Sequence, residues 1–236
     1  MTNQIRNNTE KRISAVEAIF IKSGKIRAVR VWNGGKIHEV DVYLSTVTFD
    51  KWDQAQSIKC RISAFHYTDY TPAMWDIYQK TCTLYIDTGH NGQGSVWAKN
   101  QIAGNDLYYL KIEAEKQFPI KGKHLVFLGD QTGIGHFCSL QQLATKNTPI
   151  SGLVTFNDSQ SAEAFSENCP WLPLQAVSNY DAIHKQTEDW VIKHQAEKEN
   201  FVFYVVGGKE LIVTIRKLLR TYGFDESQIK SKGFWH

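Results

Sequence analysis

The chain has 236 residues, of which 42% are hydrophobic and 22% charged, and this composition is that of an ordinary globular protein. Its formal net charge of +3 is too small to indicate a nucleic-acid partner, and no RNP-type motif accompanies it. No apolar run approaches the ~20 residues of a membrane span, the N-terminus has no signal-peptide core, and no Cys-x-x-Cys pair indicates a metal site. We therefore expect a cytoplasmic protein that binds no nucleic acid, no membrane and no metal ion of its own.

The first half of the chain has the pattern of short strands separated by glycine turns. Residues 26–32 alternate in polarity, Asn33-Gly34-Gly35 indicates a turn, and residues 40–44 resume the period of two. Further strands are predicted over residues 58–65, 82–87 and 107–112. Short strands with glycine turns predict a small antiparallel barrel.

The second half alternates strand and helix patterns. The predicted strands cover residues 123–128, 152–156, 172–177 and 201–206, and the predicted helices cover residues 137–144, 159–166, 180–198 and 210–222. This alternation predicts a doubly wound parallel sheet. Pro119 and Gly122 interrupt the pattern, so we expect one domain over residues 1–118 and a second over 119–236.

Tyr70-Thr71-Pro72 has the residue types that a flavin site needs. Tyr70 could stack on the isoalloxazine ring, and Thr71 could reach ring atom N5 with its hydroxyl or its backbone N–H. Pro72 favours an extended Thr71, which would orient both side chains reproducibly. For the tripeptide taken alone, an ordinary edge-strand Tyr-Thr pair before a proline turn is the simpler explanation.

A glycine run, Gly92-Gln93-Gly94-Ser95, precedes an apolar helix over residues 96–102. Glycines let a backbone approach phosphate oxygens, and a helix N-terminus offers unpaired N–H groups. Ser95 is alternatively just the N-cap of the helix, and Trp97 is alternatively a core residue.

Taken together, these motifs resemble those of the siderophore-interacting proteins, a family of the ferredoxin–NADP reductase-like flavoproteins. The motifs that carry the resemblance are, in order, Thr68-Asp69-Tyr70-Thr71, the run from His90 to Ala98 that contains Trp97, Gly129-Asp130-Gln131-Thr132, Val206-Gly207-Gly208 and Gly233-Phe234-Trp235. The resemblance implies a six-stranded antiparallel barrel that binds FAD, followed by an α/β domain that binds NADPH or NADH. It places Tyr70 and Thr71 at the reacting ring. It places the other flavin and nucleotide contacts at Thr68, Pro72, His90, Gly92, Gln93, Gly94, Ser95, Trp97, Asp130, Thr132, Gly133, Gly207 and Trp235.

The sequence departs from the family pattern at the flavin diphosphate. Thr68 stands where the family has an arginine, and Gln93-Gly94 replaces its Pro-Ala pair. Loss of a guanidinium removes a charge-assisted contact worth about 1.5–3 kcal/mol, so FMN or weakly bound flavin is an alternative to tightly bound FAD. Tyr67-Thr68 is a second possible register, but the spacing to His90 favours Tyr70-Thr71.

The nicotinamide side is predicted at the carboxyl end of the first parallel strand, where Gly129-Asp130-Gln131-Thr132-Gly133 precedes a helix. A strand–helix turn that needs glycine for steric reasons is the simpler alternative. Asp158 ends the second strand and would disfavour the 2′-phosphate of NADPH, which favours NADH.

These features predict a monomeric NAD(P)H-dependent reductase that transfers electrons through a flavin to a ferric siderophore or another ferric chelate. Two alternatives remain open at the level of the sequence. One is a binding module that keeps the scaffold without the flavin. The other is a general NAD(P)H:flavin or electron-transfer reductase, because a fold does not fix an acceptor.

Overall fold

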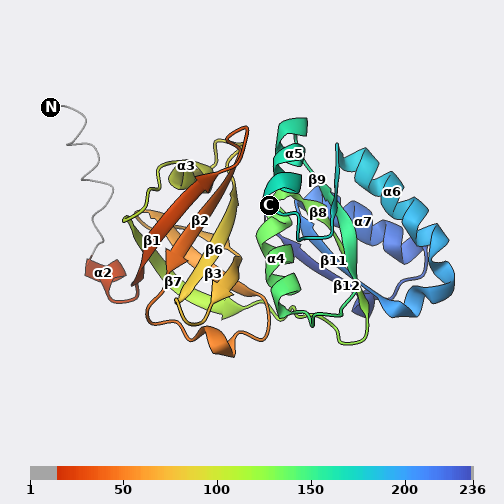
Figure 1. Ribbon diagram of the computed structural model, residues 1–236, viewed down its shortest axis with the longest axis horizontal. Coiled ribbons are helices and arrows are strands. Elements are labelled where there is room, and N and C mark those ends of the chain that lie inside the picture. The colour runs from red at the N-terminus through yellow and green to blue at the C-terminus, as the bar shows by residue number, and fades with distance from the viewer. Residues whose placement is uncertain (1–14, 235–236) are drawn as a thin grey trace.

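The computed structural model describes residues 15–234, which form two sheets that lie side by side with helix α4 between them (Figure 1). The first sheet is antiparallel, and its strand order is β4 (His66–Tyr70), β3 (Gln56–Ser63), β7 (Asp106–Ala114), β1 (Lys22–Val31), β2 (Ile37–Tyr43), β6 (Thr81–Asp87), β5 (Pro72–Asp76). Seven strands thus replace the six expected. No helix in the described range is long and apolar enough to span a membrane.

A single residue, Thr71, separates β4 from β5, although these strands are the two edges of the hydrogen-bonded order. One residue spans only about 3.3–3.6 Å, so the sheet must curl until both edges meet at Thr71. This curl makes the sheet a barrel-like layer, as the sequence predicts. The sequence gives little sign of β4 and β5, because β4 is polar and half-exposed and Pro72 interrupts the strand pattern.

The second sheet is parallel, and its strand order is β10 (Gln175–Val177), β9 (Ile150–Thr155), β8 (His124–Asp130), β11 (Phe201–Gly207), β12 (Ile229–Gly233). In chain order this is 3-2-1-4-5, so the connections reverse direction between β8 and β11, where doubly wound sheets bind their ligands. The predicted strands and helices of this half are all present. The last strand, β12, is additional, and its Ile-Lys-Ser-Lys-Gly sequence has no apolar pattern from which it could be predicted.

Helices cover both faces of the parallel sheet (Figure 1). Among residues 15–234 the α-helices are α2 (Ala15–Ala18), α3 (Gln93–Lys99), α4 (Ile134–Leu143), α5 (Ser159–Asn168), α6 (Tyr180–Lys193) and α7 (Lys209–Thr221). Alternate residues of β8 enter different cores: Phe127 packs with Phe137 of α4, and Val126 packs with Ile183 of α6. This two-sided burial explains the continuous apolar strands of the second half.

The barrel and the parallel sheet share one hydrophobic core. Trp32 and Ala73 of the barrel are buried in the same cluster as Phe137 and Phe165, from α4 and α5. The side-chain amide of Gln142 on α4 also accepts from the Trp75 N–H of β5 at 3.0 Å and donates to the Trp75 carbonyl at 2.8 Å. The contact between the two sheets is therefore packed by side chains along α4.

The connection between the sheets runs from Ala114 at the end of β7 to His124 at the start of β8, and the boundary expected at 118/119 falls within it. Backbone and side chains fix this connection: Ala55 N–H donates to the Gln117 carbonyl at 2.8 Å, and the Tyr204 hydroxyl donates to the Phe118 carbonyl at 2.6 Å. It is thus a bound segment and not a free linker.

Candidate functional site

Thr68 and Tyr70 lie on the same face of β4 because strand side chains alternate. Both face Gly94 in the first turn of α3. A Cβ on residue 94 would lie 2.6 Å from the Tyr70 hydroxyl oxygen and 3.5 Å from the Thr68 hydroxyl oxygen. Glycine at 94 is therefore required by the approach of β4, and the residue in the arginine position of the family does lie beside the glycine turn.

Tyr70 is packed on its ring face by Trp97, with ring centroids 5.9 Å apart and an interplanar angle of 24°. Both rings adjoin the barrel core. Burial raises the pKa of the Tyr70 phenol, and its hydroxyl has no hydrogen-bond partner among the described residues. A buried hydroxyl without a partner is unfavourable by about 1–3 kcal/mol, so it marks a position where a ligand oxygen would be stabilising.

The turn before α3 is held by side chains of the turn itself. Gly92 is the N-cap, and its N–H donates to His90 Nδ1 at 2.9 Å. Ser95 is buried, and its hydroxyl donates to the Asp87 carbonyl at 3.3 Å, so the reading of Ser95 as the N-cap is wrong. Gln93 is the first residue of the helix.

Thr71 lies at the contact between the two sheets. Its hydroxyl is 3.5 Å from Nδ1 of His136 on α4, and His136 Nε2 is 2.8 Å from Oε1 of Gln117. The Gln117 amide donates to the Ser231 carbonyl at 3.0 Å, which leaves Oε1 as the acceptor. His136 therefore carries its proton on Nε2, and Nδ1 accepts from the Thr71 hydroxyl. Pro72 lies buried just beyond, at the start of β5.

His136 and Gln117 lie beside Thr71, and the sequence analysis did not name either of them. A histidine inside an apolar helix pattern and a glutamine in a connection have no distinguishing spacing. Burial lowers the pKa of His136 to about 3, so the ring is neutral at physiological pH.

Asp130 connects the loops at the carboxyl edge of the parallel sheet. Its carboxylate accepts from the Thr132 N–H and hydroxyl at 3.0 and 2.5 Å, and from the Gly208 N–H at 2.7 Å. A Cβ on Gly207, whose φ is +147°, would lie 2.5 Å from Asp130 Oδ2. These contacts set the spacing between the ends of β8 and β11.

Gly133 and Gln131 complete this edge. A Cβ on Gly133 would lie 3.1 Å from the Val206 carbonyl, so this glycine serves the packing of β11. The side-chain Nε2 of Gln131 is buried and has no partner within the described part of the chain, and a Cβ on Gly89 of the barrel turn would lie 3.7 Å from it. A second orphaned polar atom thus lies where the two domains meet.

The charged residues near this edge behave differently from the expectation. Asp158 is the N-cap of α5, accepts from the Ser161 N–H at 2.9 Å, and pairs with Lys36 of the barrel at 3.0 Å. These contacts hold the pKa of Asp158 below its usual range. Its charge is therefore balanced by Lys36 and engaged in capping, which removes much of its preference against a 2′-phosphate.

No guanidinium replaces the missing arginine in the described structure. Arg61 is buried in an ion pair with Glu17, with Nε and Oε1 3.0 Å apart. His66 is exposed and bonds the Ala64 carbonyl at 2.9 Å. Trp235, the last predicted contact, lies outside the described residues. Within residues 15–234, no three His, Cys, Asp or Glu side chains gather as a metal site.

The comparisons with known proteins agree with this geometry. The family model described as "Siderophore-interacting protein" matches residues 122–236. The structure of the siderophore-interacting protein from Acinetobacter baumannii has a TM-score of 0.73 at 11% identity, over 91% of this chain and 90% of that one. The siderophore-interacting protein from Aeromonas hydrophila has a TM-score of 0.66 at 13% identity, over 91% of each chain.

Reductases of the wider group have the same fold. The ferredoxin–NADP+ reductase from Plasmodium falciparum has a TM-score of 0.69 at 16% identity, over 94% of this chain and 98% of that one. No curated protein matches in the sequence search. The resemblance inferred from the sequence is thus confirmed: residues 122–236 match the siderophore-interacting protein family, and the chain has the two-domain fold of these proteins and of ferredoxin reductase-like flavoproteins.

Proposed function

We propose that the chain is an NAD(P)H-dependent flavoprotein reductase whose acceptor is a ferric siderophore or a similar ferric chelate. Membership of the C-terminal half in the siderophore-interacting family supports the acceptor, and the fold shared with ferredoxin reductases supports the flavin and nicotinamide. Hard oxygen ligands hold Fe(III) far better than Fe(II), so reduction releases the metal from an intact chelator.

The observation that carries the proposal is the position of Thr71. It follows Tyr70 on the barrel, and a Cβ on Gly135 at the start of α4 would lie 3.0 Å from the Thr71 carbonyl. Gly133, two residues earlier, lies against Val206 near the end of β11. One continuous contact therefore joins the predicted flavin residues to the carboxyl edge that would hold the nicotinamide, as hydride transfer between two bound rings requires.

The residues present fit the phosphate end of a flavin through the unpartnered Tyr70 hydroxyl. This hydroxyl would donate to a phosphate or ribityl oxygen, Thr68 would add a second hydroxyl, and the glycine at 94 lets β4 bring both close to the first turn of α3. A bound flavin would supply the two-electron to one-electron conversion that no side chain can perform.

The chain's own residues would orient the reactants and hold protons in place. His136 Nδ1 accepts a hydrogen bond from the Thr71 hydroxyl, so the lone pairs of the Thr71 oxygen stay available as acceptors for a donor N–H. Asp130 holds Gly207 and Gly208 close to β8, which keeps side chains out of the space above the sheet edge. Gln131 Nε2 remains available as a donor to a nucleotide oxygen.

Titration of the purified protein with FAD or FMN, followed by an assay of nicotinamide oxidation, tests this function. We expect quenching of flavin fluorescence on binding, followed by NADH or NADPH oxidation that depends on a ferric chelate. If the flavin binds but cytochrome-type acceptors are reduced faster than ferric chelates, the protein is instead a general electron-transfer reductase.

A second candidate is a binding module without redox chemistry, and the packing of Tyr70 favours it. Its ring lies against Trp97, and no guanidinium stands beside Gly94 to hold a diphosphate. In this case the protein quenches the fluorescence of neither FAD nor FMN, but it still binds the chelate.

A further inference from the structure

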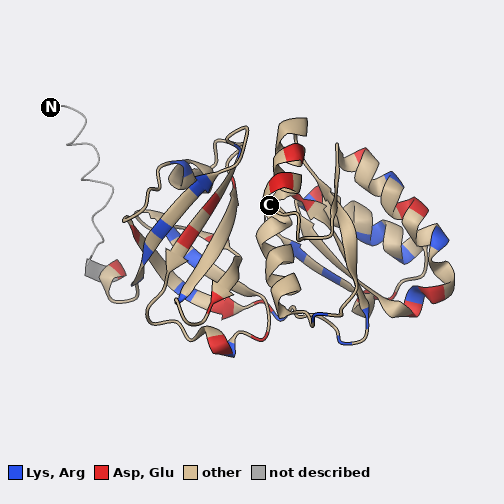
Figure 2. Cartoon of the chain, viewed as in Figure 1, with Lys and Arg blue, Asp and Glu red and all other residues tan. Residues whose placement is uncertain are grey.

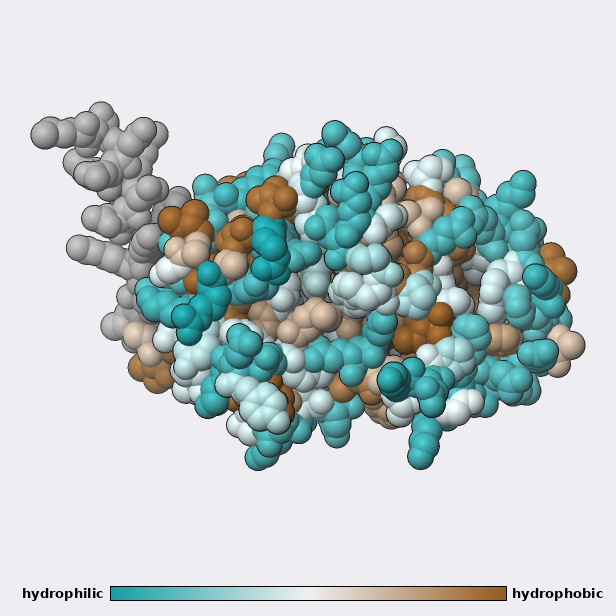
Figure 3. Space-filling view, in the orientation of Figure 1, coloured by the Kyte–Doolittle hydropathy of each residue, from teal (hydrophilic) through white to brown (hydrophobic). Residues whose placement is uncertain are grey.

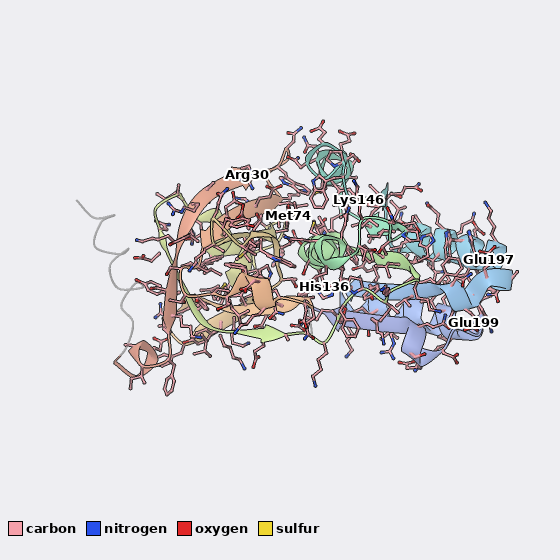
Figure 4. All side chains as sticks on the ribbon, turned by 60° about the horizontal axis from the view of Figure 1, so that its bottom comes forward. Arg30, Met74, His136, Lys146, Glu197 and Glu199 are labelled. Atoms are coloured by element: carbon pink, nitrogen blue, oxygen red, sulfur yellow. The ribbon has the colours of Figure 1, made fainter. Side chains whose placement is uncertain are left out.

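A pocket lies on the outer face of the barrel. Its volume is about 650 Å³, within the range of small-ligand sites. Arg27 and Arg30 of β1, Asp41 of β2, and Gln79, Thr81 and Thr83 beside or on β6 supply its polar groups. Met74 of β5 lies at its edge (Figure 4).

The floor of the cavity is a row of side chains that crosses three strands. Arg30 donates to both carboxylate oxygens of Asp41, at 2.5 and 2.9 Å, and Thr83 donates to the same carboxylate at 2.7 Å. Basic and acidic side chains accordingly lie together on β1 and β2 (Figure 2). The row fixes the Arg30 guanidinium before any ligand arrives, which lowers the entropy lost on binding.

Donors exceed acceptors in this cavity. Arg30 uses three of its five N–H groups, on Asp41 and on Glu39 at 2.8 Å, and two remain. The Asp41 carboxylate is already engaged on both oxygens. Arg27 lies over the Tyr43 ring, 4.6 Å from guanidinium carbon to centroid, and makes no ion pair in the described range. Two guanidinium groups that each have unused N–H donors suit an oxygen-rich anion.

The cavity adjoins the strand that carries the predicted reacting residues. Thr83 pairs with Ala73 of β5, and Pro72, which follows Thr71, pairs with the next residue of β6. At about 3.3 Å per residue, Met74 is roughly 10 Å along the strand from Thr71. A ligand here would therefore lie near the predicted reacting residues.

We propose that this cavity, defined by Arg27, Arg30, Asp41 and Thr83, binds an anionic, oxygen-rich metal chelate. The inference rests on the proposed function for the identity of that ligand as the ferric substrate. It places the substrate on the barrel. Two other basic residues, Arg216 and Lys111, are already paired, with Glu226 and Glu113 respectively. In the view of Figure 3 the surface over the barrel mixes hydrophilic and hydrophobic residues.

The test uses two gallium chelates, because Ga(III) matches Fe(III) in charge and preferred ligands but is not reduced. Calorimetric titration of the full chain with the trianionic Ga(III) tris-catecholate should show binding, and the neutral Ga(III) tris-acetohydroxamate should bind more weakly. Arg27→Glu should weaken catecholate binding by about ten- to a hundredfold, the cost of a lost charge-assisted contact.

Lys22→Glu is the matched control. Lys22 is exposed on the same strand, lies outside the cavity, and the substitution changes the net charge equally. It should leave binding unchanged. Met74→Trp fills the edge of the cavity at an exposed position and should weaken both chelates. Far-UV circular dichroism confirms that each variant is folded.

Any one of three results would overturn the proposal. The unmodified chain binds no catecholate, or Arg27→Glu and Lys22→Glu lower the affinity for the catecholate equally, or neither substitution lowers it. Its failure is distinct from failure of the reductase function, because gallium binding needs no flavin. Chelate binding without flavin uptake would support the cavity and refute the reductase. If the chain reduces the ferric chelate with a bound flavin and Arg27→Glu leaves the KM for the chelate unchanged, the cavity proposal is refuted and the reductase function is not.

Discussion

Tyr70 ends β4 with its hydroxyl buried against α3 and without a partner in residues 15–234. In the absence of a ligand this hydroxyl is destabilising. Tyr70→Phe should therefore raise the free energy of unfolding of the cofactor-free chain by about 1 kcal/mol, and it should weaken flavin binding if the hydroxyl serves the cofactor. Urea unfolding and flavin titration measure the two effects.

Gly94→Ala probes the same contact from the other side. The added Cβ would lie 2.6 Å from the Tyr70 hydroxyl oxygen, so we expect a loss of about 1–3 kcal/mol in urea unfolding. Combining it with Tyr70→Phe removes the overlapping atom and should restore part of that loss. Strict additivity in the double variant would mean that the contact between residues 70 and 94 is not the cause.

His136 gives the chain a pH dependence of known sign. Its pKa falls from an ordinary 6.5 to about 3 in the folded state, chiefly through burial and to a lesser degree through Lys232. At pH 7.5 both states hold the neutral ring, so its full contribution is present. As the pH falls below 6.5 the unfolded chain binds a proton that the folded chain does not, and stability declines until about pH 3.

Between pH 7.5 and pH 5 this one group should lower the free energy of unfolding by about 2 kcal/mol. His136→Gln removes the titration, so its stability should fall less over the same interval. Urea denaturation at the two pH values measures the difference. Parallel declines in both proteins would show that other groups dominate.

At the scale of elements, β8 and β11 approach so closely that their junction admits only glycine. A Cβ on Gly129 would lie 2.2 Å from the Val206 carbonyl and 2.8 Å from the Phe137 ring. The first glycine of the predicted nucleotide motif is therefore required by strand and helix packing, whichever ligand binds above it.

Gly129→Ala should accordingly destabilise the cofactor-free chain by about 2–3 kcal/mol, because the neighbouring backbone must move. Gly233→Ala is the control at the end of β12, where the nearest atom would be Ile212 Cδ1 at an ordinary 3.6 Å. Thermal unfolding of the two variants compares them. Equal melting temperatures would refute the steric reading.

At the scale of the whole molecule, the two sheets should unfold together because they share a core. Trp32 is 3% exposed, contacts Phe165 of α5 at 6.4 Å between centroids, and donates its indole N–H to Glu39 at 2.7 Å. The ion pair between Lys36 and Asp158 crosses the same contact but is partly exposed. Apolar packing, and not the ion pair, should hold the domains together.

Trp32→Ala should cost about 3–5 kcal/mol and separate calorimetric unfolding into two transitions, since the shared core is lost. Lys36→Ala should change stability by less than about 1 kcal/mol and leave one transition. Two transitions in the unmodified chain would contradict the shared core.

Alternation and apolar runs in the sequence were enough to predict the architecture. The period of two in residues 26–32 and the buried run of residues 123–128 follow from which faces of each strand are covered, a local property. β4, β5 and β12 could not be predicted, because polar strands are held by pairing with neighbours that are distant in the chain.

The candidate site likewise combines features that the sequence predicts with features that it does not. Glycines and the Tyr-Thr pair mark their positions in the sequence because close approach restricts the residue type locally. The bonding of His136 to Thr71, the balance of Asp158 by Lys36 and the arginine cavity depend on segments that only folding brings together. Tertiary structure alone decided these contacts, since no local pattern records which distant side chain completes a hydrogen bond or balances a charge.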